Sequence, residues 1–399
     1  MIQQALQDKF DAFTIPDELK KAGVYPYFRP IQVNNDTEVV IDGKNLLMFG
    51  SNSYMGLTNH PKVKEAASKA LEQYGSCCSG SRFLNGTSRL HIELEEALAD
   101  YTGKEACLVF TTGFQANLGT VSAFTGRSGV IIMDEYNHAS IYEGSRLSFS
   151  KVLKYSHNDM ADLERLLKTI PEATVKMIVF DGIFSMEGDI ANLPEICALA
   201  NKYQAMVMCD DAHAVGVIGD CGRGTASHFG LTNDVDIIMG TFSKSLASVG
   251  GYIASTKDAI NYLKHTSRPM IFSASIPPSG VAAAMAALEI IKAEPERQER
   301  LWQNTHYVSK SLTELGFDIN TSETPIIPIY IRDNQLTFQF CQRLFEEGIF
   351  VNPVVSPAVP SDSSLIRLSI MATHTQEQLN TCIGKIEKVA QELGVFAMK

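Results

Sequence analysis

The stretch that decides the fold is residues 105–255, which carry six short apolar runs: ACLVF (106–110), GVIIMD (129–134), VKMIVFDG (175–182), AMVMCDD (205–211), VDIIMG (235–240) and GYIAS (251–255). Most of these runs are unbroken, as is typical of strands in a sheet that is covered on both faces. We therefore expect a mainly parallel central sheet in a three-layer α/β sandwich. Ligands of such sheets bind beyond the C-terminal ends of the strands.

The fifth run continues into DIIMGTFSKSLASVGG (236–251), where a buried strand leads into a turn that presents Lys244. The immediate neighbours of this lysine, residues 241–247, carry no other charge. Partial desolvation lowers the pKa of an ammonium, and the neutral amine forms Schiff bases with carbonyl compounds such as pyridoxal phosphate. For this stretch alone, an ordinary lysine at a helix start with hydroxyl caps beside it is an equal alternative.

Four other strand ends carry polar or glycine-rich groups. The turn at Gly113–Phe114 opens a helix after the first run, so its backbone N–H groups could bind a phosphate. His138 follows the second run and Ser185 the third, while Asp210 and His213 follow the fourth. Taken singly, the glycine turn and the histidines are more often structural features than binding groups.

Taken together, these groups meet the requirements of pyridoxal phosphate. The cofactor needs a lysine for its aldehyde, a carboxylate for its pyridine nitrogen and an anion site for its phosphate. An imidazole or aromatic face stacked on the ring is also expected. The candidates are Lys244 for the aldehyde, Asp210 for the ring nitrogen, Gly113–Phe114 with Thr241 and Ser243 for the phosphate, and His138 for the ring face.

The order of motifs resembles that of the α-oxoamine synthases, a family of aminotransferase-like, fold-type I pyridoxal phosphate enzymes. The motifs are TTGFQAN (111–117), YNHAS (136–140), DGIFSMEGD (181–189), CDDAHAVGVIGDCGRG (209–224) and GTFSKSLASVGG (240–251). The resemblance spans nearly the whole chain, from Asn52 in NSYMGL to Arg367 in IRLSI, and is strongest to the bacterial serine palmitoyltransferases. Two positions, Asp211 and Ala214, depart from the usual pattern of the family without removing a cofactor contact.

The resemblance also implies roles for individual residues. Lys244 would bind the aldehyde and act as general base, while His213 and Ser185 would line the ring and a histidine would polarise the thioester. Ser273 and Ala274 match residues that reach the cofactor phosphate of the other subunit, which implies a homodimer with shared active sites. Arg367 would hold the carboxylate of the amino acid through its guanidinium, potentially in a bidentate manner. The other substrate-binding candidates are Asn52, Arg82 and His138.

The reaction implied by the resemblance is a decarboxylative Claisen condensation of L-serine with palmitoyl-CoA. Its products are 3-ketodihydrosphingosine, CoA and carbon dioxide, in the first step of sphingolipid synthesis. The loop GSCCSGSRFLNGTSRLH (75–91) resembles the version found in serine-using members. Two alternatives stay open: glycine or alanine with a shorter acyl-CoA, as in the 2-amino-3-ketobutyrate and 8-amino-7-oxononanoate synthases, and a catalytically silent partner or sensor of the same fold. Arg367 could also merely point outward and pair with a surface acid.

The chain divides by pattern into three parts: an N-terminal arm and hairpin (1–55), a large cofactor-binding α/β domain (56–293) and a small α+β domain (294–399). The hairpin is expected to turn at Asp42–Gly43. PVVSPAVP (353–360) is an extended loop that could form part of an acyl channel or serve only as a rigid connector.

Composition limits the classes of partner. The 399 residues carry a formal net charge of -11, which argues against non-specific binding of nucleic acid. No run approaches the roughly 20 apolar residues of a membrane span, and the N-terminus lacks an apolar signal core. We therefore expect a cytoplasmic enzyme without a transmembrane segment. Peripheral contact with a membrane stays open as an alternative. The eight cysteines show neither a CxxC pair nor metal-ligand spacing, which predicts free thiols and no metal site.

Overall fold

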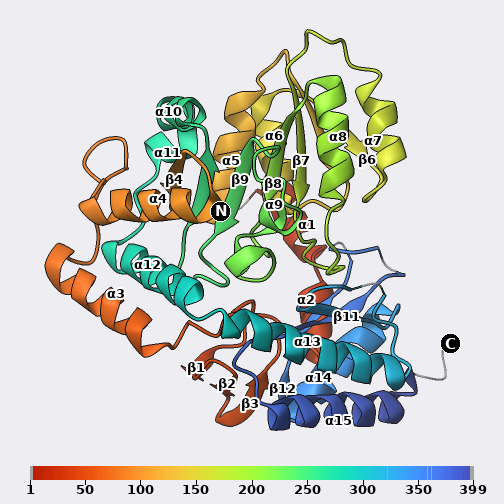
Figure 1. Cartoon of the computed structure of the whole chain (residues 1–399). Helices are drawn as coiled ribbons and strands as arrows, with labels where there is room; N and C mark the ends of the chain where they lie inside the picture. Colours follow the sequence, from red (N-terminus) through yellow and green to blue (C-terminus); the bar gives the residue numbers. More distant parts are fainter. Residues whose placement is uncertain (1–2, 321, 357, 361, 396–399) are drawn as a thin grey trace.

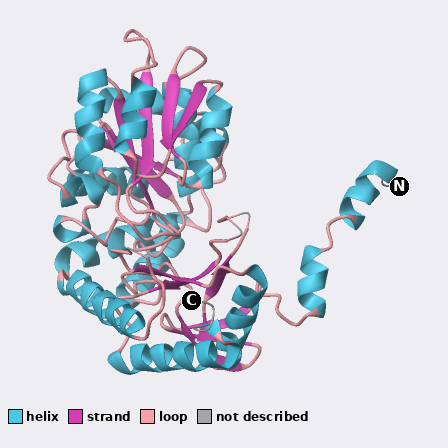
Figure 2. Cartoon of the chain, turned by 90° about the vertical axis from the view of Figure 1, so that its right-hand side faces the viewer, coloured by secondary structure: helices cyan, strands magenta, loops and turns pink. Residues whose placement is uncertain are grey.

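The computed structural model describes residues 3–320, 322–356, 358–360 and 362–395. A large α/β body lies next to a smaller lobe built mainly from the C-terminal part of the chain (Figure 1). The first two helices stand away from both, on an arm that projects to one side (Figure 2). No side chain of these two helices is buried in the chain itself.

The central sheet of the large body has seven strands in the order β4-β10-β9-β8-β7-β5-β6. Their bounds are β4 Ala106–Phe110, β5 Val130–Asp134, β6 Lys151–Tyr155, β7 Lys176–Asp181, β8 Met206–Asp210, β9 Ile237–Thr241 and β10 Gly251–Ser255. Strands β6, β5, β7, β8 and β9 run parallel to one another, and β10 is antiparallel to both of its neighbours. The mainly parallel sheet expected from the sequence is therefore confirmed.

All six predicted runs are strands, and the strand that the pattern did not predict is β6 at the sheet edge. Its sequence, KVLKY, is only partly apolar, and both of its lysines are exposed. Edge strands are commonly protected by such lysines, and the resulting mixed pattern does not resemble that of a buried strand.

Both faces of the sheet are covered. Successive residues of one strand belong to different hydrophobic clusters: Ile131 and Met133 pack on one side, whereas Ile132 packs on the other. This alternation follows from the two-residue period of a strand, and it explains why the runs are apolar throughout. The three-layer sandwich is thus confirmed.

The helices of the large body flank this sheet and connect its strands. Their bounds are α3 Pro61–Tyr74, α4 Arg89–Thr102, α5 Gly113–Phe124, α6 Ala139–Ser148, α7 Met160–Leu167, α8 Leu193–Tyr203, η1 Asp220–Gly222, α9 Thr225–His228, α10 Lys257–Thr266, α11 Arg268–Phe272 and α12 Pro278–Ala293. The arm helices are α1 Gln4–Asp11 and α2 Ile15–Lys21.

The small lobe contains two sheets and three long helices. Its elements are β11 Ile326–Tyr330, β12 Ile349–Phe350, β13 Asn352–Val354, β14 Leu365–Ser369, α13 Glu296–Glu314, α14 Asn334–Glu346 and α15 Gln376–Leu393. β14 is the middle strand of the sheet β11-β14-β13. Only Pro353 and Val354 of the predicted extended loop 353–360 lie in a strand, and residue 357 falls outside the described residues.

The predicted N-terminal hairpin is present and is joined to the small lobe. Strands β1 Ile31–Asn34, β2 Glu38–Ile41 and β3 Lys44–Met48 are antiparallel, and both turn residues, Asp42 and Gly43, have positive φ. β12 of the small lobe pairs in parallel with β3. This pairing brings the N-terminal segment and the C-terminal lobe into one sheet, although more than 300 residues separate them in the sequence.

None of the helices in the described ranges is long and apolar enough to cross a membrane. Among the same residues, no group of three or more His, Cys, Asp or Glu side chains is arranged to hold a metal ion. All eight cysteines are free thiols.

Candidate active site

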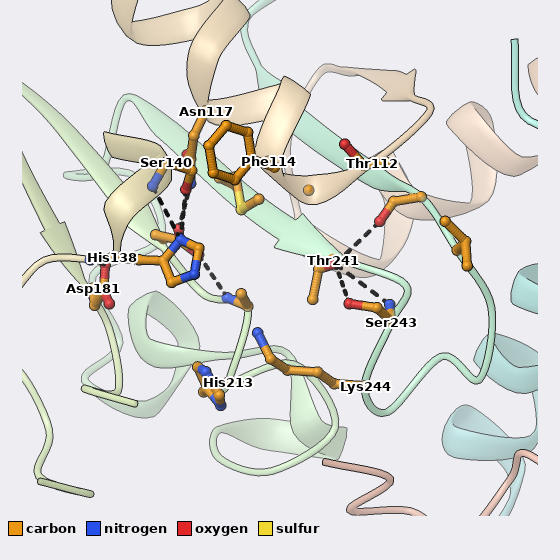
Figure 3. A pocket seen from close by; sticks show the side chains of 16 residues that line it. Thr112, Phe114, Asn117, His138, Ser140, Asp181, His213, Thr241, Ser243 and Lys244 are labelled. Carbon is orange, nitrogen blue, oxygen red and sulfur yellow. Dashed lines mark hydrogen bonds between the residues drawn. The ribbon is translucent and has the colours of Figure 1, made fainter. Parts of the chain in front are cut away.

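A pocket of about 280 Å³ lies at the C-terminal edge of the central sheet (Figure 3). Strands β4, β5, β8 and β9 all point to this edge, so the residues that follow them converge there. Eight of the residues singled out in the sequence line the pocket: Gly113, Phe114, His138, Asp210, His213, Thr241, Ser243 and Lys244.

Lys244 lies in the turn after β9 and projects into the pocket between His138 and His213 (Figure 3). Removal from water lowers the pKa of its ammonium to about 8, although the carboxylates of Asp210 and Asp181 counteract this effect. A substantial fraction of this amine is therefore neutral near pH 8, as a nucleophile toward an aldehyde must be.

Asp210 ends β8 with a carboxylate that is fixed on both oxygens. Oδ2 accepts a hydrogen bond from Asn117 Nδ2 at 2.6 Å, and Oδ1 accepts one from the backbone N–H of Ala212 at 2.9 Å. Asn117 also donates to Ser140 Oγ at 2.8 Å. The acid is thus held in one orientation in the lining of the pocket.

A second carboxyl group, that of Asp181, lies beside Asp210. The two residues are directly paired across β7 and β8, and both line the pocket. Burial, reinforced by the charge of Asp210, raises the pKa of Asp181 well above its usual value. Because two close carboxylates resist ionising together, burial beside Asp210 favours the neutral form of Asp181.

His138 is the N-cap of α6, and its ring faces the pocket. Its Nδ1 accepts a hydrogen bond from the backbone N–H of Ser140 at 3.3 Å and lies 2.7 Å from Ser140 Oγ. Burial lowers the pKa of this imidazole, an effect that Asp210 opposes and Lys244 reinforces. A neutral ring that is fixed by its cap presents a flat, uncharged face to a ligand.

The N-terminus of α5 also lines the pocket. Thr112 caps this helix through Gln115 N at 3.1 Å, and the first helical residue is Gly113. A Cβ at Gly113 would lie 2.8 Å from Thr241 Oγ1, so only glycine fits here without displacing the threonine. Thr241 Oγ1 lies 2.9 Å from Ser243 Oγ, which places two hydroxyls beside the free N–H groups of the helix. This arrangement is suited to a phosphate.

Arg367, Asn52 and Ser185 form a second cluster that adjoins the pocket. Arg367 is 6% exposed on the central strand β14, which excludes the alternative that it points outward. Its Nε donates to Ser185 O at 2.6 Å and its Nη1 to Asn52 Oδ1 at 2.8 Å and Ser369 Oγ at 2.9 Å, while Nη2 donates to Tyr54 OH at 3.3 Å.

The guanidinium of Arg367 is therefore largely occupied by the protein. Four of its five N–H groups have acceptors among the described residues, which leaves one N–H on Nη2 for a substrate. A bidentate contact through two free N–H groups, which the sequence suggested, would require Tyr54 to give up its hydrogen bond. Ser185 meets the arginine through its backbone carbonyl and does not line the pocket.

Three further candidates lie outside this pocket. Arg82 forms a buried ion pair with Glu95 at 2.9 Å and donates to Val109 O at 3.3 Å, so its charge is already compensated and its placement counts against a substrate contact. Ser273 accepts a hydrogen bond from Gln115 Nε2 at 3.1 Å, and Ala274 O accepts one from Thr111 at 2.5 Å. Both flank the start of α5 from outside.

The pocket and cluster residues that were not singled out from the sequence include Asn117, Ser140, Asp181 and Tyr54. A signal existed for Asn117, because it lies one helical turn after Gly113 and so shares its face of α5. Tyr54 carried no such signal, since its partners are far away in the chain. Asp211, one of the departures from the family pattern, faces away from the pocket and accepts from Thr225 N at 3.0 Å.

The set of donors fits pyridoxal phosphate on the geometry alone. A lysine with a lowered pKa, a fixed carboxylate, a neutral imidazole face and a helix N-terminus flanked by two hydroxyls surround one pocket. Each is a group that this cofactor requires.

Comparison with known proteins agrees with this donor set. The model of the family "Aminotransferase class I and II" matches residues 44–386. The chain is 57% identical to the serine palmitoyltransferase of Sphingobacterium spiritivorum over 398 residues, which is 100% of both chains. It is 44% identical to the 8-amino-7-oxononanoate synthase of Thermoanaerobacter pseudethanolicus, covering 95% of this chain and 96% of the relative.

A solved structure shows the same fold. The serine palmitoyltransferase of S. paucimobilis, with a bound pyridoxal phosphate–myriocin aldimine, superposes with a TM-score of 0.96 at 36% identity, covering 98% of this chain and 100% of the other. From the family match and these similarities, the chain belongs to the class I and II aminotransferase family, in its α-oxoamine synthase branch.

Proposed function

We propose that this chain is a pyridoxal phosphate-dependent serine palmitoyltransferase. It joins L-serine to palmitoyl-CoA and releases CoA and carbon dioxide, which leaves 3-ketodihydrosphingosine. The observation that carries the proposal is the pocket in which Lys244, Asp210 and His138 converge with the N-terminus of α5. The identity of 57% to a serine palmitoyltransferase, against 44% to an 8-amino-7-oxononanoate synthase, favours serine over alanine or glycine.

Different residues of the pocket are suited to different groups of the cofactor. Lys244 would bind the aldehyde, Asp210 would bind the ring nitrogen, and the start of α5 with Thr241 and Ser243 would bind the phosphate. His138 would supply a flat face for the ring. When bound, pyridoxal phosphate supplies an electron-withdrawing ring that stabilises negative charge at the α-carbon of the amino acid.

A carboxylate at Asp210 would keep the nitrogen of a bound cofactor ring protonated. Two hydrogen-bond donors, Asn117 and the N–H of Ala212, hold this side chain in place. Burial raises the pKa of Asp181, so this neighbour adds no second negative charge beside Asp210. Asn117 and Asp181 therefore support the reaction without contacting the amino acid.

Lys244 also serves as the general base for the α-proton of serine. An amine with a pKa of about 8 accepts a proton effectively near neutral pH and releases it again. Arg367 holds the carboxylate of serine and so sets which bond at the α-carbon faces the reacting system. His213 presents a neutral imidazole to the same space, since burial, with the cations of Lys244 and Arg367 nearby, lowers its pKa well below the usual value.

A homodimer is part of the proposal. Ser273 and Ala274 lie outside the pocket of their own chain, beside the start of α5. This placement supports a role at a subunit interface, in which they reach the phosphate bound by the other subunit. We place the dimer in the cytoplasm. Size-exclusion chromatography with light scattering should give twice the mass of one chain.

The test of the function uses the purified chain and pyridoxal phosphate. A visible absorbance band should form, and borohydride reduction should attach the cofactor to the peptide that contains Lys244. CoA release is then measured with L-serine, glycine and L-alanine, each against a series of acyl-CoA lengths. Serine with palmitoyl-CoA should be fastest. A preference for glycine or alanine would reassign the substrate, and absence of the band would support a catalytically silent relative.

A further inference from the structure

We infer that Tyr54 is a positioning residue, which fixes the ring proton of His213 on Nε2 and links this histidine to Arg367 through one shared hydroxyl. The inference rests on the proposed function, because it assigns the N–H of His213 to the pocket and Arg367 to the substrate carboxylate. It concerns a residue of the loop after β3 that does not line the pocket itself.

The hydroxyl of Tyr54 is buried at the junction of three segments. The side chain is 1% exposed, and its oxygen lies 2.7 Å from His213 Nδ1. It also lies 3.3 Å from Nη2 of Arg367 and 3.4 Å from Asn52 Oδ1. The histidine follows β8, and the arginine belongs to β14, so Tyr54 connects the large body to the small lobe.

The direction of each hydrogen bond follows from the available protons. A guanidinium only donates, so the Tyr54 oxygen accepts from Arg367. The hydroxyl has a single proton of its own, and the two atoms that could accept it are His213 Nδ1 and Asn52 Oδ1. Asn52 Oδ1 already accepts from Arg367 Nη1 at 2.8 Å, and its distance to Tyr54 is beyond the usual range of an O–H···O bond. The proton therefore points to His213 Nδ1.

An Nδ1 that accepts a proton from Tyr54 cannot carry one of its own. The lowered pKa of His213 makes the ring neutral, and a neutral imidazole has a single N–H, here on Nε2. Among the described residues no hydrogen-bond partner of Nε2 is found, and His213 lines the pocket beside Lys244 (Figure 3). This N–H is thus available to an oxygen that gains negative charge during the reaction.

The shared hydroxyl also couples the two functional groups. Arg367 can keep its Nη2 bond to Tyr54 only while Tyr54 holds the orientation that serves His213. The residue that binds the serine carboxylate and the residue that donates into the pocket are therefore aligned by one side chain. Loss of the hydroxyl should disturb both, whereas a tyrosine that merely fills the core would affect stability alone.

The matched control is Tyr101→Phe. Tyr101 lies on α4, outside the pocket lining, and is also 1% exposed. Its hydroxyl donates to Cys221 O at 2.9 Å. In the holoenzyme, Tyr54→Phe should retain the cofactor absorbance but lose about tenfold or more in kcat, since the partner that sets a catalytic histidine's tautomer usually matters by that much. The KM for L-serine should rise. Tyr101→Phe should shift the melting temperature without changing either constant.

A second measurement does not depend on activity. Nitrogen-15 NMR of histidine-labelled apoprotein distinguishes the two neutral tautomers, and the His213 signals are identified by their loss in His213→Gln. The wild-type ring should carry its proton on Nε2, and Tyr54→Phe should change this signal. An Nδ1 proton in the wild type, or unchanged kcat and KM in a folded Tyr54→Phe enzyme, would overturn the inference. Failure of the wild type to use serine with any acyl-CoA would overturn the proposed function instead, while the NMR result would still decide the tautomer.

Discussion

Replacing Arg367 with lysine should weaken the binding of L-serine and leave the cofactor in place. The guanidinium holds four protein acceptors, Ser185 O, Asn52 Oδ1, Ser369 Oγ and Tyr54 OH, at 2.6 to 3.3 Å. A lysine ammonium is a single point with three donors, so it cannot reach this set and the substrate together. None of these four acceptor residues lines the pocket proposed to hold pyridoxal phosphate.

The expected magnitude follows from the N–H count. One N–H of Nη2 remains for the serine carboxylate, and one hydrogen bond between charged groups contributes about 1.5 to 3 kcal/mol. With a factor of ten for every 1.4 kcal/mol, loss of this bond corresponds to about a 10- to 100-fold weaker affinity. The rate of α-deprotonation should fall as well, because a carboxylate held less firmly aligns the reacting bond less well.

Two measurements on the holoenzyme test this reasoning. L-serine is titrated while the visible absorbance is followed, and exchange of the serine α-proton with deuterated solvent is recorded by NMR. Arg343→Lys serves as the control, since Arg343 lies on α14 and pairs with Glu346 and Glu392 on the surface. Equal affinity and equal exchange in Arg367→Lys and wild type would refute the assignment of Arg367 to the substrate.

Two further changes test the rest of the site, and a third tests the ion pairs of His157, which does not line the pocket. Lys244→Ala should fold but lose activity by several orders of magnitude, because the amine binds the aldehyde and moves the α-proton; more than a few per cent residual CoA release would contradict this. Asp210→Asn should bind the cofactor yet slow exchange of the serine α-proton by about 100-fold or more, and a normal exchange rate would remove Asp210 from the ring nitrogen. Burial disfavours the cationic form of His157, but its contacts with Asp134 and Asp189 outweigh this effect and raise its pKa to about 10. The charged histidine therefore stabilises the fold fully below about pH 6.5, and this stabilisation declines as pH rises toward 10. His157→Gln should flatten this part of the curve of unfolding free energy against pH by on the order of 3 kcal/mol, and an unchanged slope by chemical denaturation would count against the charged state.

The local pattern of the sequence was sufficient to predict most of the large body. Unbroken apolar runs identify strands that are covered on both faces, and the residues directly after them must lie at one edge of a parallel sheet. Lys244, Asp210 and His138 were predictable for this reason. The edge strand β6 was not, because its exposed lysines interrupt the apolar run. The pairing of β12 with β3 was also unpredictable, since it joins distant segments.

Only the tertiary structure decided which partners these side chains have. The sequence offered both Arg82 and Arg367 as candidates for binding the substrate. In the structure, the charge of Arg82 is neutralised by Glu95, whereas Arg367 retains one N–H beside the pocket. The link from Tyr54 to His213 and Arg367 spans 159 and 313 residues. The sequence determined the strands and the residues at their ends because periodicity is a local property. The proton positions and the remaining donors depended on contacts between distant segments, which form only when the small lobe packs against the sheet.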